Sequence, residues 1–279
     1  MLIRYFIILS MIRILFKSIS IIPWPILRFI SWVLGHLAIL LNVSAYKVTK
    51  KNLIYCGFND EKLIKQSFLN TMELLFEYPY IWGNPNNYKK LVENPEVIVQ
   101  DENPKIFMTM HMGCVDVMLF LISEKNKGIN ILYTPAKNKN IEKATKESRS
   151  KKGANLIPAN MSGIKLLLSK FNQKEDFVIA PDLVPHTNKE TYSYFFNQEC
   201  LTVDIVERLS YRESHNLYFI YFTKGENKKY KLNCKKISKK INMLEMNQLF
   251  EHAIKESISL YGWEYKKFRK LRGEQKNIY

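Results

Sequence analysis

The spacing of apolar residues changes along the chain between the period of a helix and that of a buried strand. Residues 61–82 carry apolar side chains every three or four positions, and Asn59 and Asp60 before them favour the start of a helix. Short apolar runs typical of buried strands lie at residues 97–99, 105–110, 129–135, 154–158 and 176–182. Segments that predict helices lie between the later runs, at residues 115–123, 140–152 and 162–171. This alternation predicts an α/β fold, with a parallel or mixed sheet covered by helices.

The last third of the chain departs from this order. Residues 217–223 and 229–237 alternate in the manner of an antiparallel pair of strands, and residues 244–260 have helical spacing. An antiparallel pair joined to the earlier strands indicates a mixed sheet.

The first 46 residues are apolar and contain basic residues but no Asp or Glu. Within them, residues 29–46 carry no formal charge and approach the ~20 residues that a helix needs to span a bilayer. A cleaved signal peptide, a buried helix of a soluble domain and a membrane-spanning or deeply embedded anchor are the three interpretations. We favour the anchor, because no small-residue cleavage site follows. We therefore expect an N-terminal membrane anchor at 1–46 and a second domain at 47–279.

The charge after the expected anchor indicates its orientation. Lys47, Lys50 and Lys51 follow it directly, and the positive-inside rule then places the rest of the chain in the cytoplasm.

Over the whole chain, 42 Lys and Arg against 26 Asp and Glu give a formal net charge of +16. Nucleic acid, a membrane surface, a phosphorylated lipid and an acidic carrier protein are all anionic partners that fit this surplus.

Composition and motifs exclude several classes of protein. A hydrophobic content of 47% excludes an intrinsically disordered chain. Aromatic residues are frequent, but no helix-turn-helix, zinc-finger or RNA-binding block supports nucleic acid as the partner. The four cysteines have neither metal-binding spacing nor that of a disulfide framework, so we interpret them as reduced thiols in a cytosolic environment.

A histidine follows directly after one of the predicted buried strands, at the end where open α/β sheets bind ligands. After His111 come Gly113 and, at the start of the next predicted helix, Asp116. Five residues of one helix turn about 140°, but a bend at Gly113 lets the two side chains meet. An imidazole held by a carboxylate is a general base, and with no GxSxG elbow it would activate a substrate hydroxyl directly. By itself the pattern is more typical of a structural histidine, and Cys114 is more typical of a small buried residue than of a thiol nucleophile.

Together with later residues, this motif resembles that of a known family. His111-x4-Asp116 is similar to the H-x4-D/E signature of glycerolipid acyltransferases, and its surroundings resemble the bacterial lipid A biosynthesis lauroyl/myristoyl acyltransferases. The other blocks that carry the resemblance are Asn52-Leu53 before Phe58, YTPAKNKNIE at 133–142, Arg149 with Gly153, Ile157 and Pro158, Pro181-Asp182, and WEYKKFR at 263–269. Each block is modest alone, and their order and spacing make the resemblance specific.

The resemblance implies a fold, a reaction and a cellular location. The fold would be glycerol-3-phosphate-acyltransferase-like, a mixed sheet flanked by helices with an N-terminal membrane helix. The reaction would transfer a fatty acyl chain from an acyl-carrier-protein thioester to a hydroxyl of a lipid A precursor. The expected partners are the acyl carrier protein, a membrane lipid acceptor and the membrane surface, with no nucleic acid. Apart from acyl-ACP or acyl-CoA as co-substrate, no cofactor or metal is expected, and the catalytic domain would face the cytoplasm from the bacterial inner membrane.

The resemblance also implies roles for five residues. His111 would take the proton of the acceptor hydroxyl, and Asp116 would orient His111. Arg149, with Lys137 beside it, would contact a phosphate or the oxyanion, because guanidinium and ammonium groups stabilise concentrated negative charge. Asp182 would contact the acceptor, bind a nearby basic group or cap the next turn.

Two departures from the family pattern bear on the acceptor. Asp116 stands where the lipid A branch has Glu, as it does in the phospholipid branch, and Lys267 replaces an Arg, which removes bidentate phosphate recognition there. The alternatives are a lysophospholipid or glycerolipid acyltransferase using acyl-CoA or acyl-ACP, a membrane-anchored nucleic-acid-binding protein, and an inactive relative that binds lipid. The lysine-rich stretches 224–240 and 266–276 fit an anionic membrane surface or an acidic carrier protein.

Overall fold

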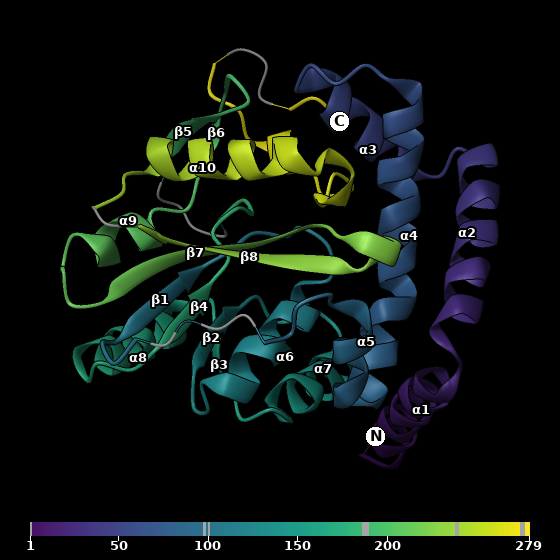
Figure 1. The fold of residues 1–279 in the computed structure, drawn as a ribbon, viewed down its shortest axis with the longest axis horizontal. Coiled ribbons are helices and arrows are strands. Elements are labelled where there is room, and N and C mark those ends of the chain that lie inside the picture. The colour runs from purple at the N-terminus through teal and green to yellow at the C-terminus, as the bar shows by residue number, and fades with distance from the viewer. Residues whose placement is uncertain (1, 97–98, 100, 186–189, 238–239, 274–276) are drawn as a thin grey trace.

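The centre of the protein is a mixed β-sheet (Figure 1) in the computed structural model, which describes residues 2–96, 99, 101–185, 190–237, 240–273 and 277–279. Within these residues six strands form the sheet, in the order β3-β2-β4-β1-β7-β8. Their bounds are β1 Lys105–Met108, β2 Asn130–Tyr133, β3 Asn155–Pro158, β4 Phe177–Ile179, β7 Asn216–Lys224 and β8 Tyr230–Ile237. The first five in chain order are parallel, and β8 runs antiparallel to β7. The sheet confirms the predicted mixed α/β class.

Helices cover both faces of the sheet, as Figure 1 shows for α10 on one side and α6 on the other. The helices that flank it are α6 Val115–Lys125, α7 Lys139–Ser150, α8 Met161–Asn172 and α10 Met243–Glu256. Side chains alternate across the strands, so that Ile106 and Met108 belong to one buried cluster and Phe107 to the other. The strand-and-helix order predicted between residues 105 and 182 is confirmed, with ends that differ by a few residues.

Several elements of the structure have no counterpart in the sequence prediction. These are a hairpin of β5 Tyr192–Phe195 and β6 Gln198–Leu201, the short helices α5 Tyr88–Leu91 and α9 Ile205–Ser210, and the 3-10 turns η1 Pro85–Asn87, η2 Glu226–Lys228, η3 Ile258–Leu260 and η4 Lys267–Arg269. The helix predicted at 244–260 ends at Glu256 and is followed by η3. Residues 97 and 98 of the predicted strand 97–99 lie outside the described residues.

The N-terminal helices pack against the rest of the protein. They are α1 Leu2–Ile21, α2 Trp24–Leu40, α3 Ser44–Tyr55 and α4 Glu61–Gly83. The Asp60 side chain caps α4 as predicted, accepting a hydrogen bond from the Lys62 N–H at 2.9 Å. Figure 1 shows α1 and α2 at one side of the molecule, beside α4.

The expected membrane helix at 29–46 is not one continuous helix. Residues 41–43 separate α2 from α3, because the apolar run ends in a turn where Asn42 has a left-handed φ of 50°. Among the described residues, no single helix is long and apolar enough to cross a bilayer. Ile7–Ile21 and Trp24–Leu40 meet these criteria only as a pair, bent by 110° at the break before Pro23-Trp24. The division of the chain into domains at residue 46 remains a prediction.

Helix α1 contacts the end of α4 and the helix α7. A Cβ on Gly83 would overlap the backbone carbonyl of Phe16, so the two helices touch at this glycine. The Phe16 ring lies 5.2 Å from that of Trp82, centroid to centroid. Arg13 binds both carboxylate oxygens of Glu147 on α7, at 2.7 and 2.8 Å. Helix α1 is therefore joined to α7, the helix that carries Arg149.

Much of the outer surface of α1 and α2 is apolar. Large hydrophobic side chains at least half exposed include Met11, Ile14, Leu15, Ile21, Phe29 and Leu40. Many exposed apolar side chains on two consecutive helices are typical of a site that contacts a membrane or another protein.

Candidate active site

His111 lies just beyond the carboxyl end of β1, beside the end of β4. These strands are parallel neighbours, with Met108 paired to Ile179, so the segments that leave them run side by side. The segment after β4 carries Asp182, 71 residues after His111. Strand pairing therefore brings these two side chains together at the edge of the sheet where α/β proteins bind their ligands.

Asp182 holds His111 through two hydrogen bonds. Its Oδ1 lies 2.8 Å from His111 Nδ1, and its Oδ2 accepts the His111 backbone N–H at 3.0 Å. Asp182 is only 1% exposed, and its backbone carbonyl accepts a hydrogen bond from Lys267 Nζ at 2.7 Å. With Nδ1 bound to the carboxylate, Nε2 is the ring nitrogen left to exchange a proton with a substrate.

The electrostatics of the pair favour a charged imidazole. Burial lowers the pKa of His111, but the charge of Asp182 and its hydrogen bond outweigh burial, so the pKa lies above its ordinary value. Burial raises the pKa of Asp182, yet His111 and its two N–H groups bring that pKa below the ordinary value. An ionised carboxylate beside the imidazole stabilises the imidazolium that forms when a general base takes up a proton.

A glycine lets the chain turn directly after His111. Gly113 has a left-handed φ of +65°, and a Cβ there would overlap the ring of Tyr230. The Gly113 N–H donates to the Leu260 carbonyl at 2.7 Å, and the His111 carbonyl accepts the Gly262 N–H at 2.9 Å. The C-terminal segment therefore fixes the backbone on both sides of His111.

The carboxylate of Asp116 is bound by Arg149 and Trp82. Arg149 Nε lies 3.0 Å from both carboxylate oxygens, and its Nη2 lies 2.9 Å from Oδ1. The indole Nε1–H of Trp82 donates to Oδ2 at 2.6 Å. Asp116 is fully buried in the first turn of α6, where the helix dipole also favours an anion. The network joins α4, α6 and α7.

The expected contact between His111 and Asp116 is therefore replaced by another. The structure pairs His111 with Asp182 and pairs Asp116 with Arg149, because the planar guanidinium forms a fork that matches a carboxylate. Three roles are expected for Asp182, and its contact with His111 corresponds to the binding of a nearby basic group. Asp116 reaches the site through Arg149, and its catalytic role remains a prediction.

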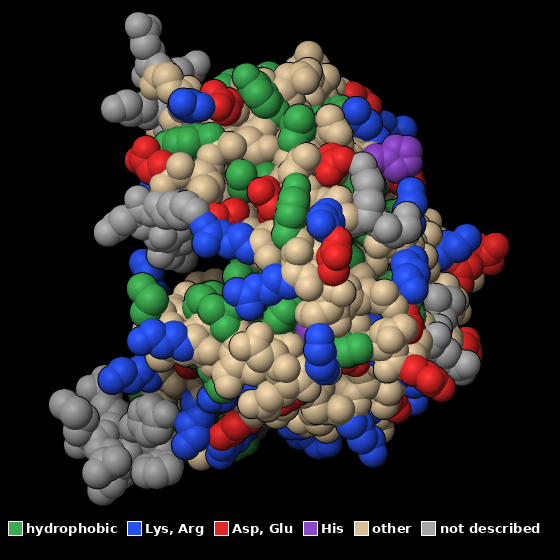
Figure 2. Space-filling model, turned by 90° about the vertical axis from the view of Figure 1, so that its left-hand side faces the viewer, with side chains coloured by type: hydrophobic (Ala, Val, Ile, Leu, Met, Phe, Trp, Pro, Cys, Tyr) green, Lys and Arg blue, Asp and Glu red, His purple; other side chains and the backbone are tan. Residues whose placement is uncertain are grey.

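A cavity of about 700 Å³ opens at His111. His111 and Arg149 both line it, and its remaining wall is largely apolar, with Val115, Leu119, Ile131, Ile164, Val178 and Ile179. Its volume falls within the ~300–1,000 Å³ of typical ligand sites. Figure 2 shows a hollow at its left-hand edge where hydrophobic side chains lie inside a rim of Lys and Arg. Asn160, Asp204 and Arg208 also line the cavity, and the apolar part of its wall suits an apolar chain.

The other predicted residues lie outside this cavity. Lys137 is exposed on the loop between β2 and α7 and does not line it. Cys114 is fully buried, and burial raises the pKa of its thiol well above the ordinary value, as expected of a small core residue. Across the described ranges, no group of three His, Cys, Asp or Glu side chains is placed to hold a metal ion.

The sequence did not predict the roles of three residues that support the site. Trp82 belongs to the helical pattern of residues 61–82, and nothing in that pattern marks its indole as a donor to Asp116. The sequence marks Lys267 only as a replacement for an Arg of the family pattern that removes bidentate phosphate recognition. In the structure it is 3% exposed and donates to the Asp182 carbonyl. Asn52 likewise joins distant blocks, because its side-chain amide donates to the carbonyls of Trp263 and Tyr265 at 2.6 and 2.8 Å.

Comparison with known proteins identifies the family. The sequence model of the bacterial lipid A biosynthesis acyltransferases matches residues 1–270 of the 279. The chain belongs to this family. It is therefore an acyltransferase that acts in lipid A biosynthesis, which confirms the resemblance seen in the motifs. A comparison with curated proteins gives no match.

Proposed function

We propose that this acyltransferase moves a fatty acyl chain from an acyl-carrier-protein thioester to a hydroxyl of a lipid A precursor, with His111 as the general base. The observation that carries the proposal is the His111–Asp182 pair at a largely apolar cavity that Arg149 also lines. The apolar wall of the cavity accommodates the acyl chain, and the thioester and the hydroxyl meet at His111 and Arg149.

The proton and the acyl group move in two linked steps. His111 Nε2 takes the hydroxyl proton as the oxygen attacks the thioester carbonyl, and Asp182 stabilises the imidazolium. Arg149 faces the negative charge that develops on the carbonyl oxygen, and Asp116 and Trp82 hold the guanidinium in place. The intermediate then expels the thiolate, which recovers the proton from His111. The ester forms as the thioester breaks, and no acyl-enzyme intermediate is required.

We further propose that the enzyme works at the cytoplasmic face of the bacterial inner membrane. The exposed apolar side chains of α1 and α2 support membrane contact, and the net charge of +16 supports an acidic carrier protein and an anionic membrane surface as partners. Lys137, exposed on the loop after β2, is available to a phosphate of either substrate.

The experiment is lipid mass spectrometry of cells that lack the gene, complemented with variants. We expect lipid A to lose one secondary acyl chain, and the wild-type protein to restore it. The His111→Ala variant is expected to fail, whereas His252→Ala, which removes a histidine whose side chain is 79% exposed on α10, restores the chain.

Two results would contradict the proposal. Restoration by His111→Ala would exclude that residue as the base. Intact lipid A together with altered phospholipid chains would instead assign the enzyme to glycerolipid acylation. With purified protein, transfer from acyl-CoA but not from acyl-ACP would refute the carrier-protein donor.

A further inference from the structure

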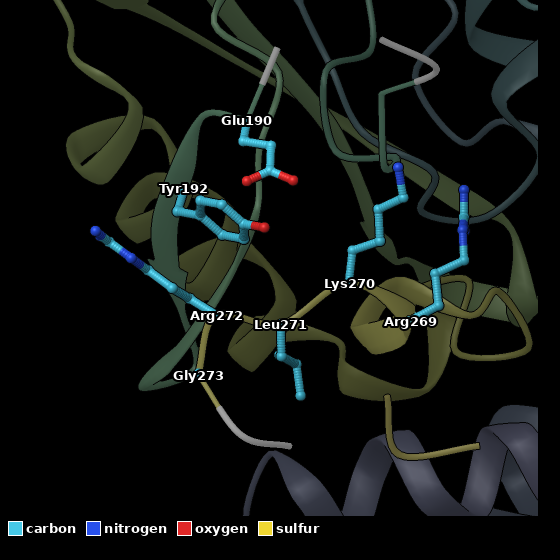
Figure 3. A pocket seen from close by; sticks show the side chains of 7 residues that line it. All are labelled: Glu190, Tyr192, Arg269, Lys270, Leu271, Arg272 and Gly273. Carbon is cyan, nitrogen blue, oxygen red and sulfur yellow. The ribbon is translucent and has the colours of Figure 1, made fainter. Parts of the chain in front are cut away.

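Figure 3 shows the residues that line a second groove, of about 560 Å³, and residues 190–192 connect this groove to the catalytic cavity. Glu190 and Tyr192 line this groove, whereas Thr191 between them lines the cavity. Successive side chains of an extended segment point to opposite sides, so one strand of chain separates the two spaces. The remaining wall of the groove is made by residues 269–273, which follow Lys267.

The walls of the groove carry opposite charges. In Figure 3 the Glu190 carboxylate and the Tyr192 hydroxyl lie on one side, and the Lys270 and Arg269 side chains extend along the other. Lys270 forms no side-chain hydrogen bond or ion pair with the described residues. Arg269 donates one N–H to the Lys266 carbonyl at 3.0 Å and lies over the Tyr265 ring, which leaves further N–H groups for a ligand.

Arg272 contributes less to the groove than its position suggests. Its guanidinium forms an ion pair with Glu199 at 2.9 Å and extends away from Lys270 in Figure 3. The cations available to a ligand are therefore Arg269 and Lys270, opposite a carboxylate and a phenol. This combination does not suit an acyl chain, which has no charge to neutralise.

We propose that this groove binds the phosphorylated sugar head group of the acceptor lipid. Arg269 and Lys270 bind the phosphate, since guanidinium and ammonium groups form charge-assisted hydrogen bonds with its oxygens. Glu190 accepts hydrogen bonds from sugar hydroxyl or ammonium groups, and the Tyr192 hydroxyl is directed toward the same space (Figure 3). The assignment of the head group to the acceptor rests on the proposed function.

The groove lies within reach of the base. Lys267 contacts the Asp182 carbonyl, and Lys270 is three residues further on, a span of at most about 11 Å in an extended chain. The Tyr265 hydroxyl accepts the N–H of Val184, which lines the catalytic cavity. A lipid bound with its phosphate at Lys270 therefore has its sugar hydroxyls next to the segment that holds His111.

The test is calorimetric titration of the full-length protein in detergent micelles with glucosamine 6-phosphate. We expect Lys270→Gln to raise the Kd by about 10-fold, the usual loss when one charged hydrogen bond is removed. The control is Lys235→Gln on the exposed surface of β8, which removes the same charge and is expected to leave the Kd unchanged. Glucosamine without phosphate is expected to bind more weakly than its phosphate, and equally to both variants.

A phosphate in this groove could belong to the acceptor lipid or to the acyl donor, and titration with coenzyme A distinguishes the two. If Lys270→Gln raises the Kd for coenzyme A and leaves the Kd for glucosamine 6-phosphate unchanged, the groove binds the donor and the assignment to the acceptor is overturned. Equal Kd values for the sugar phosphate in all three proteins would overturn the site itself. Binding is measured without turnover, so a protein that binds the probe but does not acylate lipid A would refute only the proposed reaction.

Discussion

Replacing Asp182 by Asn is expected to abolish most of the activity and to leave the fold in place. The amide oxygen can still accept the His111 backbone N–H, but the amide nitrogen then faces His111 Nδ1 and donates to it. The imidazole is forced into the tautomer with its proton on Nε2, the atom that must accept the proton of the substrate. The variant therefore removes the base without removing the histidine.

The size of the loss follows from the lost base. General bases contribute about 10²- to 10⁴-fold to rates, so we expect kcat/KM to fall by roughly 10³-fold, or ~4 kcal/mol. The pH profile gives a second measure. In the wild type, kcat/KM falls with decreasing pH as His111 becomes protonated, at a pKa above its ordinary value because of Asp182. In the variant, the residual activity falls only at lower pH, since a neutral amide no longer stabilises the imidazolium.

The assay is the initial rate of acyl transfer in detergent micelles across the pH range. Asp176→Asn is the matched control, because Asp176 precedes the other end of β4 and binds the Lys105 backbone N–H at 2.7 Å, away from the cavity. A loss no larger than that of the control, or an acidic limb that does not move, would refute the pairing of His111 with Asp182 as the source of the base.

Two further predictions concern buried polar groups. Trp82→Phe removes the indole donor to Asp116, so we expect kcat to fall by roughly 10-fold with little change in KM, as loss of a charged hydrogen bond predicts. Trp24→Phe, whose buried indole N–H has no partner among the described atoms, is expected to leave kcat unchanged, and equal losses would contradict the role of Trp82. Burial raises the pKa of Glu77 to about 8, although Tyr230 donates a hydrogen bond to it. The unfolded chain therefore ionises Glu77 at a lower pH than the folded protein does, and the free energy of unfolding falls as the pH rises from 4.5 to 8. Glu77→Gln is expected to be more stable than wild type by roughly 3–5 kcal/mol above pH 8. Below about pH 4.5 Glu77 is neutral in both states, so the melting temperatures of variant and wild type should converge there, and a difference that persists at acidic pH would contradict this explanation.

The sequence predicted the elements that local periodicity can encode. The strands and helices between residues 105 and 182 follow from runs of four to eight apolar residues and from helical spacing. The hairpin of β5 and β6 was missed because its strands carry polar residues on both faces and so show no apolar run. The N-terminal apolar run was recognised. Pro23 and Pro25 lie where α1 ends and α2 begins, but composition does not give the 110° angle between the two helices.

The members of the candidate site were predictable, and their pairing was not. His111, Asp116, Arg149 and Asp182 all occur in recognisable blocks. Spacing along the chain favoured a contact over five residues, whereas the structure joins His111 to a carboxylate 71 residues away. That contact depends on the parallel pairing of β1 with β4, and the spacing of apolar residues along the chain does not determine the order of strands in a sheet.

The contact of Gly83 with Phe16 has a consequence for shortened forms of the protein. An enzyme whose membrane segment is only a tether can lose it and keep its chemistry in solution. Here helix α1 supplies the ring that packs on Trp82 and the arginine that binds α7, so removal of α1 uncovers the tryptophan that supports Asp116. A chain that begins after residue 21 is therefore expected to differ from the full-length protein at Trp82, and through it at the carboxylate of Asp116.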